Sequence, residues 1–280
     1  MATSVVIQNS MSSTKVFLRR LPFFLAHLVC FAPFFMEFKT SGVILALGFY
    51  YGRMFFVTGA YHRYFSHRTY KTSRVFQFIL AYLAMTSSQK GVLWWAAHHR
   101  THHKYSDTDS DVHSPSLSGF WWSHVGWILS PTTEKTNYSL VPDLAKYSEL
   151  RWLNRWFMIP PVSLAVTLFF LGGWHALVWG FFISTVMLWH GSFSINSLAH
   201  IIGRARYPTT DLSKNSLPLA LVTMGEGWHN NHHYYQASTR QGFFWWELDI
   251  TYYGLVILSW LGLIWDLRQP PKSLIARTAA

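Results

Sequence analysis

Long apolar stretches alternate with polar and charged segments along this chain of 280 residues. Residues 21–61 and 156–195 each hold two apolar runs separated by a short link, which is polar at 37–41 in the first and is Gly172-Gly173 in the second. A run of about 20 apolar residues is long enough to cross the hydrocarbon core of a bilayer as a helix. The pattern therefore predicts four transmembrane helices, arranged as two hairpins.

The rest of the chain, at residues 62–155 and 196–280, is largely polar, charged and aromatic. Two weaker apolar runs interrupt it. Residues 75–95 predict either a weak span or a helix along the membrane surface, and residues 250–265 predict one surface helix. No repeat or linker divides the sequence. We expect a single all-α integral membrane domain over residues 1–280, in which the polar segments form a helical cap on the cytosolic side of the hairpins.

The composition supports a membrane protein. Half of the residues are hydrophobic and 12% are charged, whereas soluble domains carry about 25% charged residues. The net charge of +11 fits basic loops on the cytoplasmic side of a membrane. A nucleic-acid-binding function is disfavoured, because the aromatic residues lie in apolar runs and not on a soluble basic face. Both ends of the first hairpin are expected in the cytoplasm, since basic residues flank it: Lys15, Arg19, Arg20, Arg63 and Arg68.

Fifteen histidines are the unusual feature of the sequence, and nine of them form four clusters just beyond the apolar runs or between them. Residues three and four apart share one face of a helix, and a spacing of five fits a helix end or a local π-type turn. The clusters are His62 with His67; His99, His102 and His103; His200, which follows Asn196 by four residues; and His229, His232 and His233.

These spacings predict a metal site. Imidazole binds zinc, copper, iron and nickel, and nine histidines indicate two metals, because one metal needs only about four to six ligands. Structural zinc sites favour cysteine, and Cys30 is the single cysteine. The four clusters meet only if they lie on one side of the membrane, which requires residues 75–95 not to cross it.

Six histidines lie outside these clusters. Three within apolar runs are expected to pack or to lie at the membrane interface: His27, His175 and His190. Three in polar segments are expected to face solvent, lie at the interface or support a ligand: His98, His113 and His124. A metal transporter is disfavoured, because its histidines would lie within the spans.

The boxes H-x4-H, H-x2-H-H and H-x2-H-H, with N-x3-H, resemble those of the membrane fatty acid desaturase superfamily, in particular its bacterial stearoyl-CoA Δ9 desaturase-like branch. The sequence motifs around these boxes are similar too: Gly59-Ala-Tyr-His-Arg-Tyr-Phe-Ser-His, Ser123-His-Val-Gly-Trp and Gly225-Glu-Gly-Trp-His-Asn-Asn-His-His. The resemblance covers about residues 18–267. It implies a multi-pass enzyme of the bacterial inner membrane, with a cytoplasmic active site, that uses O₂ and two Fe²⁺ ions to introduce a cis double bond of the Δ9 type into a fatty-acyl chain.

The resemblance also implies the ligands of the two irons, and no catalytic residue beyond these ligands is expected. One iron is bound by five histidines: His62, His67, His99, His103 and His232. The other iron is bound by four histidines, and Asn196 holds a water ligand beside them: His102, His200, His229 and His233.

Desaturation of this kind consumes two external electrons and releases two waters in each cycle. No haem-binding or flavin-binding extension is visible, so a separate donor of the cytochrome b5, ferredoxin or rubredoxin type is expected. Such donors are often acidic, and a basic cytosolic face would attract one. The alternative reaction on the same metal pair is hydroxylation of a fatty acid, sterol or alkane. The sequence motifs that begin at Asn196 and Gly225 favour desaturation.

The sequence departs from the acyl-CoA branch where those members bind the coenzyme head group. Their Arg-Asp pair before the second box is Ala97-His98 here, and their basic pair after the Val-Gly-Trp word is replaced by Ser-Pro-Thr at 130–132. Lys90 stands where they carry an asparagine. Lys90 and His98 are therefore the candidate head-group contacts, and CoA, glycerolipid and acyl carrier protein all remain open as carriers of the acyl chain.

Three charged residues are candidate supports for the metal ligands. Asp107 and Glu226 lie close to histidine boxes, and metal-bound imidazoles commonly need a carboxylate to orient them. Arg53 lies within an apolar run, where a charge usually faces the protein interior. Its predicted role is to support a metal ligand or to lock the helix bundle, and the alternative is a snorkelling or packed structural arginine. Asp109 and Asp111 are expected to cap a loop.

Overall fold

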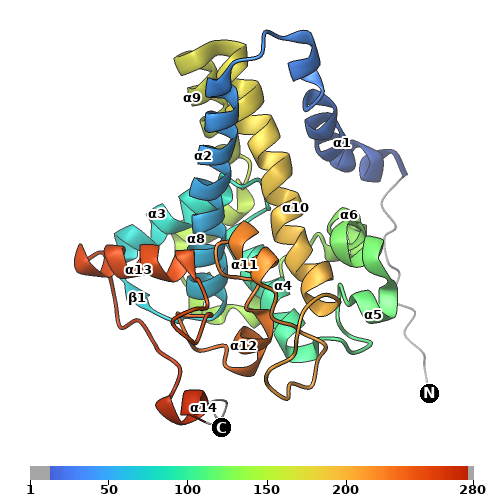
Figure 1. Ribbon diagram of the computed structural model, residues 1–280. Coiled ribbons are helices and arrows are strands. Elements are labelled where there is room, and N and C mark those ends of the chain that lie inside the picture. The colour runs from blue at the N-terminus through green and yellow to red at the C-terminus, as the bar shows by residue number, and fades with distance from the viewer. Residues whose placement is uncertain (1–12, 277–280) are drawn as a thin grey trace, which may run out of the picture.

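The computed structural model describes residues 13–276, which are mostly helical, as the all-α prediction requires (Figure 1). The ends of the predicted domain, residues 1–12 and 277–280, lie outside the described part. The α-helices are α1 (Ser13–Val29), α2 (Thr40–Phe56), α3 (Arg74–Met85), α4 (Val92–Tyr105), α5 (Pro115–Ser118), α6 (Trp127–Leu129), α7 (Pro142–Ala145), α8 (Ser148–Arg155), α9 (Ile159–Ala176), α10 (Ser184–Ser197), α11 (Leu217–Val222), α12 (His229–Tyr234), α13 (Ile250–Trp260) and α14 (Lys272–Ala276).

Short helices of the 3₁₀ or π type extend or join these: η1 (Ala32–Phe35), η2 (Val57–Ser66), η3 (Trp122–Gly126), η4 (Pro131–Thr133), η5 (Tyr138–Leu140), η6 (Leu177–Ile183) and η7 (Leu198–His200). The two strands, β1 (Lys71–Thr72) and β2 (Ile264–Trp265), pair antiparallel. This small sheet ties the segment after η2 to the C-terminal part of the chain.

Two helical stretches are long and apolar enough to cross a membrane, Thr40–Ser66 and Ile159–His200. The second is folded back on itself, because Gly172 and Gly173 leave the helical conformation (φ −148°, ψ 18° and φ 60°, ψ −154°). The positive φ at Gly173 favours glycine. As predicted, the chain turns there, and α9 packs against η6, which continues into α10 (Figure 1).

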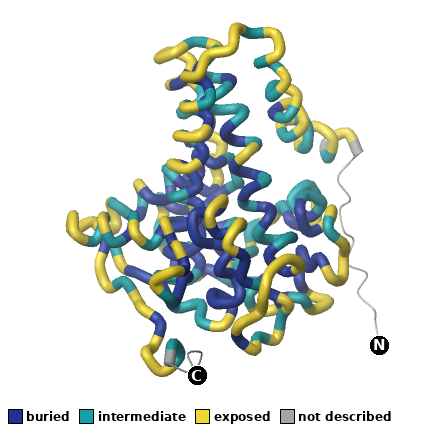
Figure 2. The backbone as a smooth tube through the Cα atoms, in the orientation of Figure 1, coloured by how far each residue is buried: buried dark blue, intermediate teal, exposed yellow. Residues whose placement is uncertain are grey.

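The tips of the long helices are apolar and exposed. Phe35 is 88% exposed at the end of η1, and Leu171 is 81% exposed in α9 just before the reversal at Gly172 and Gly173. Figure 2 shows this end of the molecule largely in the colour of exposed residues, whereas buried residues gather at the other end of the long helices. Exposed apolar surface of this extent indicates contact with lipid or with another apolar surface.

Residues 75–95 do not form one continuous helix. α3 has 12 residues and spans about 18 Å, which is shorter than the roughly 30 Å of a bilayer core. The chain then turns before α4 begins. In Figure 1, α3 and α13 lie across the direction of α2 and not along it. This arrangement agrees with the prediction that residues 75–95 do not cross the membrane.

A buried side chain from α8 fixes the start of α4. The first amides of a helix have no acceptor within the helix, and no side chain of α4 itself caps them. Asn154 supplies the acceptor: its Oδ1 accepts hydrogen bonds from the amides of Leu93 and Trp94 at 3.0 and 2.9 Å. Because α4 carries three of the clustered histidines, this contact positions them.

Arg53 supports the helix bundle and not a metal ligand, which corrects one of its two predicted roles. Its guanidinium is buried and donates to the carbonyl of Thr86 at 3.1 Å and to Oγ1 of Thr185 at 2.8 Å. A third bond reaches the hydroxyl of Ser184. These partners occupy its donors between α2, α3 and α10, and none of these hydrogen bonds goes to a histidine.

Replacing Arg53 by methionine is expected to lower the free energy of unfolding by about 2 kcal/mol or more, because a buried polar group left without its partner costs roughly 1–3 kcal/mol. Thermal unfolding in detergent, followed by tryptophan fluorescence, measures the loss. The matched control is Arg155→Met on the exposed side of α8, which we expect to change stability by less than about 0.5 kcal/mol. Equal losses in the two variants would contradict this role.

Candidate metal centre

Nine histidines from distant parts of the chain converge into two groups. Within each group, the nitrogens able to bind a metal all lie within 4.8 Å of one another. These are the two sets that the resemblance implies, so the structure brings together every histidine of the predicted site. The five-histidine group consists of His62, His67, His99, His103 and His232, and the four-histidine group consists of His102, His200, His229 and His233.

Helix geometry divides each His-x-x-His-His box between the groups. On α4, His99 and His103 are four residues apart and face the five-histidine group, whereas His102 faces the four-histidine group. On α12 the division is reversed. His232 faces the five-histidine group, whereas His229 and His233 face the four-histidine group. Each of these helices therefore joins the two groups.

The first box depends on a π-type helix. η2 continues α2 without a break, His62 lies within it, and His67 is the residue at its C-terminal cap. In a π-helix the repeat is about five residues, so two rings five residues apart come to the same side. The amide of His67 donates to the carbonyl of His62 at 3.3 Å. Of the two arrangements considered for this spacing, a helix end or a π-type turn, the structure shows a π-type turn at a helix end.

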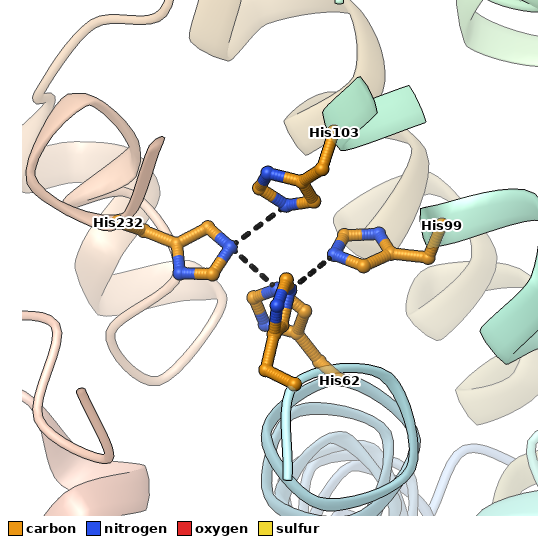
Figure 3. Close-up of side chains that lie close together, drawn as sticks. His62, His99, His103 and His232 are labelled. Atoms are coloured by element: carbon orange, nitrogen blue, oxygen red, sulfur yellow. Dashed lines mark hydrogen bonds between the residues drawn. The ribbon is translucent and has the colours of Figure 1, made fainter. Parts of the chain in front are cut away.

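The rings of the five-histidine group meet through their Nε2 atoms. Nε2 of His232 lies 3.0 Å from Nε2 of His62 and 2.9 Å from Nε2 of His103. Nε2 of His67 lies 2.8 Å from Nε2 of His99. Figure 3 shows four of these rings, from three separate segments, pointing towards a common centre.

Four carboxylates hold the opposite nitrogen, Nδ1, of four of the rings. Such contacts fix the orientation and the tautomer of metal-binding imidazoles. In the four-histidine group, both carboxylate oxygens of Asp111 lie 3.1 Å from Nδ1 of His102, and Oδ2 of Asp107 lies 2.8 Å from Nδ1 of His200. In the same group, Oδ2 of Asp211 lies 2.7 Å from Nδ1 of His233. In the five-histidine group, the carboxylate of Glu226 contacts Nδ1 of His62.

Two of these carboxylates, Asp107 and Glu226, are the predicted ones. Asp111 does cap its loop, because it accepts from the amides of Asp107 and His113 at 2.9 and 3.2 Å, but its contact with His102 shows that loop capping is not its only role. Asp211 has no sequence signal beyond its place in a polar segment between two boxes. It lies 22 residues before its partner, and only the path of the loop brings them together.

The donor set of the four-histidine group fits a bound metal ion. A neutral imidazole has one N–H, and in His102, His200 and His233 a carboxylate takes it at Nδ1. Each of these rings therefore turns a bare Nε2 lone pair into the group, where Nε2 of His200 lies 3.1 Å from that of His229. Lone pairs crowded in this way repel one another unless a cation lies between them.

The ionisation of the site suits metal binding. Burial lowers the pKa of five of the clustered histidines: that of His233 to about 4, and those of His99, His103, His229 and His232 well below the ordinary value of about 6.5. They are therefore neutral near pH 7, and neutral imidazole is the form that binds metals.

The aspartates are held as carboxylates. Burial raises the pKa of Asp107, Asp111 and Asp211, but the hydrogen bonds and charge interactions with their histidines outweigh burial and bring each pKa well below its ordinary value. In Glu226 the same opposition, with His62 and Arg63 as the partners, lowers the pKa to about 2.

Glu226 is in turn held by Arg63, which is fully buried in η2. Arg63 donates to Glu226 from Nη2 at 3.0 Å and from Nε at 3.2 Å, and to Asp249 from Nη1 at 3.0 Å. Asp249 also caps α13 by accepting from the amide of Tyr252 at 3.0 Å. Through these contacts α13 is attached to the five-histidine group.

A cavity of about 870 Å³ reaches the five-histidine group at His99. Its walls come from α1, α4, α9, η6 and α10, and most of its lining is apolar, including Phe23, Trp95, Phe182 and Trp189. Ligand pockets of this size and character take small molecules of largely apolar surface. A second, smaller opening of about 430 Å³ exposes His67 and His103 between Arg100 and Lys104.

The remaining predicted site residues all line the large cavity. Nζ of Lys90 lies 4.7 Å from the ring centroid of Trp94, and burial and the charge of Arg19 lower the pKa of Lys90 to about 8. Nδ1 of His98 lies 2.9 Å from the carbonyl of Trp94. Asn196 is fixed through its backbone carbonyl, which accepts from Oγ of Ser123 at 2.7 Å.

The other histidines take no part in either group. His27, His190 and His124 form a hydrogen-bonded chain from α1 to α10 and η3, with ring nitrogens 3.0 Å apart at both joints. His175 contacts the hydroxyl of Ser41 at 3.3 Å. His113 stacks on His102, with ring centroids 4.2 Å apart, and forms with Asp111 a third cluster that shares His102.

Comparison with known proteins decides the family, because residues 40–263 match the family described as fatty acid desaturase. The chain belongs to the fatty acid desaturase family. It is 36% identical over 256 residues to the sn-1 stearoyl-lipid 9-desaturase of Synechocystis sp., covering 91% of this chain and 80% of that protein. It is 35% identical over 241 residues to the sn-2 palmitoyl-lipid 9-desaturase of Nostoc sp., covering 84% of each.

A plant relative, an acyl-CoA 5-desaturase of Anemone leveillei, is 38% identical over 250 residues, which cover 88% of this chain and 77% of that protein. This desaturase is thus an oxidoreductase of fatty-acyl chains, and hydroxylation is not favoured. Its family and its two membrane-length helical stretches indicate association with a membrane. The clustered histidines fit the metal site that desaturation requires.

Replacing His229 by alanine is expected to abolish desaturation, because the variant lacks one of four nitrogens that converge on one position. Product formation by mass spectrometry measures activity, and gel filtration in detergent reports whether the protein remains folded. The matched control is His175→Ala, which removes a ring outside both groups and is expected to retain activity. Substantial activity in a folded His229→Ala protein would exclude the four-histidine group as part of the active site.

Proposed function

We propose that this desaturase introduces a cis double bond of the Δ9 type into an acyl chain, using O₂ and two Fe²⁺ ions held by the nine clustered histidines. One observation carries the proposal: a cavity with a mostly apolar lining is also lined by His99, a member of the five-histidine group. A methylene pair of a chain in this cavity would lie beside the metal centre. Asn196 lines the same cavity, and its proposed role is to hold a water ligand there.

Two irons, reduced by external electrons, would supply the activation of O₂ and the removal of two hydrogens from the chain. The protein contributes position and exclusion of water. Trp95 stacks on His99 with ring centroids 4.9 Å apart, and both line the cavity. The four-histidine group is entirely buried. An acyl chain bound in the cavity would therefore exclude the remaining water from the cavity side of the metal centre.

We further propose four membrane spans in two hairpins, formed by residues 21–61 and 156–195, below which residues 62–155 and 196–280 form a cytosolic cap. α1 has 17 residues and is shorter than the 27-residue stretch Thr40–Ser66 formed by α2 and η2, but it reaches the same exposed apolar tip through η1. Both hairpins then return to the end of the bundle that holds the histidines. This arrangement and the basic residues at the outer ends support the proposal of a multi-pass protein of the bacterial inner membrane with a cytoplasmic active site.

For the carrier we favour a glycerolipid over CoA. Two cyanobacterial relatives are named for acyl-lipid substrates, and Ala97-His98 replaces the Arg-Asp pair expected of acyl-CoA members. The cavity is also walled by the long apolar helices α1 and α9, next to which a membrane lipid would lie. Arg19, Arg20 and Lys90 on the same wall would meet a lipid phosphate or polar head group.

The two external electrons are proposed to come from a separate donor of the cytochrome b5, ferredoxin or rubredoxin type. The smaller opening supports this, because it brings His67 and His103 to the surface between two basic side chains, Arg100 and Lys104. An acidic donor would be attracted to such a rim.

Expression in a host that lacks unsaturated fatty acids tests the reaction and the carrier together. We expect cis-9 monounsaturated chains, lighter by two hydrogens than their precursors, to appear in glycerolipid extracts before they appear in the acyl-CoA pool. Gas chromatography with mass spectrometry of the two pools after a pulse of labelled stearate measures both. A gain of one oxygen would instead show hydroxylation, and earlier labelling of the CoA pool would exclude the lipid carrier.

Metal analysis of the purified enzyme is expected to give close to two irons per chain, since each group of imidazoles forms one site. Inductively coupled plasma mass spectrometry against protein measured by amino-acid analysis gives the ratio. The matched control is His175→Ala, which should keep both irons, whereas His229→Ala should lose about one. An active preparation with almost no iron would refute the di-iron proposal.

A further inference from the structure

The carboxylates are distributed unevenly between the two histidine groups. Three of the four rings in the four-histidine group carry an aspartate on Nδ1, but only one of the five rings in the five-histidine group, His62, carries a carboxylate. The three aspartates make no ion pair with an arginine or lysine among the described residues. Three negative charges therefore adjoin the four-histidine position without a neighbouring cation to offset them.

The single carboxylate of the five-histidine group is offset. Glu226 shares the buried guanidinium of Arg63, which Asp249 also contacts. The three residues together carry one negative charge, and part of it is directed away from His62 towards α13. The five-histidine position therefore has about one adjoining negative charge where the four-histidine position has three.

Burial increases the difference. All four rings of the four-histidine group are buried, whereas His67, His99 and His103 are partly exposed. Charges act more strongly on one another where water is excluded, because the effective dielectric constant is lower. A carboxylate bonded to a ligand imidazole also makes that imidazole the stronger electron donor to its metal. Both effects favour the higher charge state of an ion at the four-histidine position.

Resting on the proposed di-iron function, we propose that Asp107, Asp111 and Asp211 make the two metal positions electronically different, so that the iron at the four-histidine position is the harder of the two to reduce. They are positioning and tuning residues that act through His200, His102 and His233. Hydrogen bonds hold each of them in place: Ser114 and the amide of Leu212 bond Asp107, the amides of Asp107 and His113 bond Asp111, and the amide of Ser213 bonds Asp211.

The test is a redox titration of the purified, ⁵⁷Fe-loaded enzyme, in which Mössbauer spectroscopy counts ferric and ferrous iron at each poised potential. The wild-type protein is expected to reduce in two steps of equal amplitude. Asp111→Asn and Asp211→Asn are each expected to shift the step at lower potential upwards, with the other step nearly unchanged. Glu226→Gln is expected to shift only the step at higher potential. A purely structural role of the aspartates would not separate the two steps in this way.

Asp109→Asn is the matched control. It makes the same chemical change in the same loop as Asp107 and Asp111, but Asp109 is exposed and contacts no clustered histidine, so neither step should move. An aspartate variant that retains only one iron also tests the proposal, because the iron left at the five-histidine position should reduce at the higher of the two wild-type potentials. Removing such a carboxylate lowers metal affinity by about 10–100-fold, so partial iron loss is expected in the aspartate variants and not in the control.

Two results would overturn the proposal: a single reduction step for both wild-type irons, or a shift of the same step by Asp211→Asn and Glu226→Gln. Either result in an active protein with two irons leaves the desaturase function intact and removes only this inference. A wild-type protein that desaturates acyl chains without iron would overturn the proposed metal centre and this inference together.

Discussion

The crowding of imidazole nitrogens is the constraint on which the rest of the site depends. The nine rings form two groups in which the ligand nitrogens lie within 4.8 Å of one another. At least three of the Nε2 atoms carry bare lone pairs, because aspartates take the proton on the other nitrogen. Such an arrangement is unfavourable without cations. The surrounding framework must therefore hold the rings in place, and it does so with helix turns, carboxylates and a buried arginine.

That framework couples the two metal positions mechanically. α4 and α12 each contribute rings to both groups, so a rotation of either helix would disturb both positions at once. α4 is fixed at its start by Asn154, and α12 lies close to the pair formed by Arg63 and Glu226. The two groups thus share the same supporting helices, although their electrostatic surroundings differ.

The sequence was informative where the interaction is local or the pattern repeats. The five-residue spacing of His62 and His67 predicted a helix end or a π-type turn, and Gly172-Gly173 predicted the reversal between α9 and α10. Hydrogen-bond partners that meet only because of the path of a loop could not be predicted. No sequence pattern near Asp211 indicates His233 as its partner. The two roles considered for Arg53 also required the structure, because a charge in an apolar helix indicates only that it faces inwards, and its partners depend on how the neighbouring helices are rotated.

The unbroken helix from Thr40 to Ser66 has a consequence for how the enzyme meets its substrate. His62 lies 22 residues after Thr40, about 33 Å along the helix axis, and a bilayer core measures roughly 30 Å. In the proposed topology the length of this helix would place the metal centre just outside the hydrocarbon layer. An acyl chain has to rise out of its leaflet to reach the centre, so the local thickness of the membrane becomes one of the variables that govern turnover.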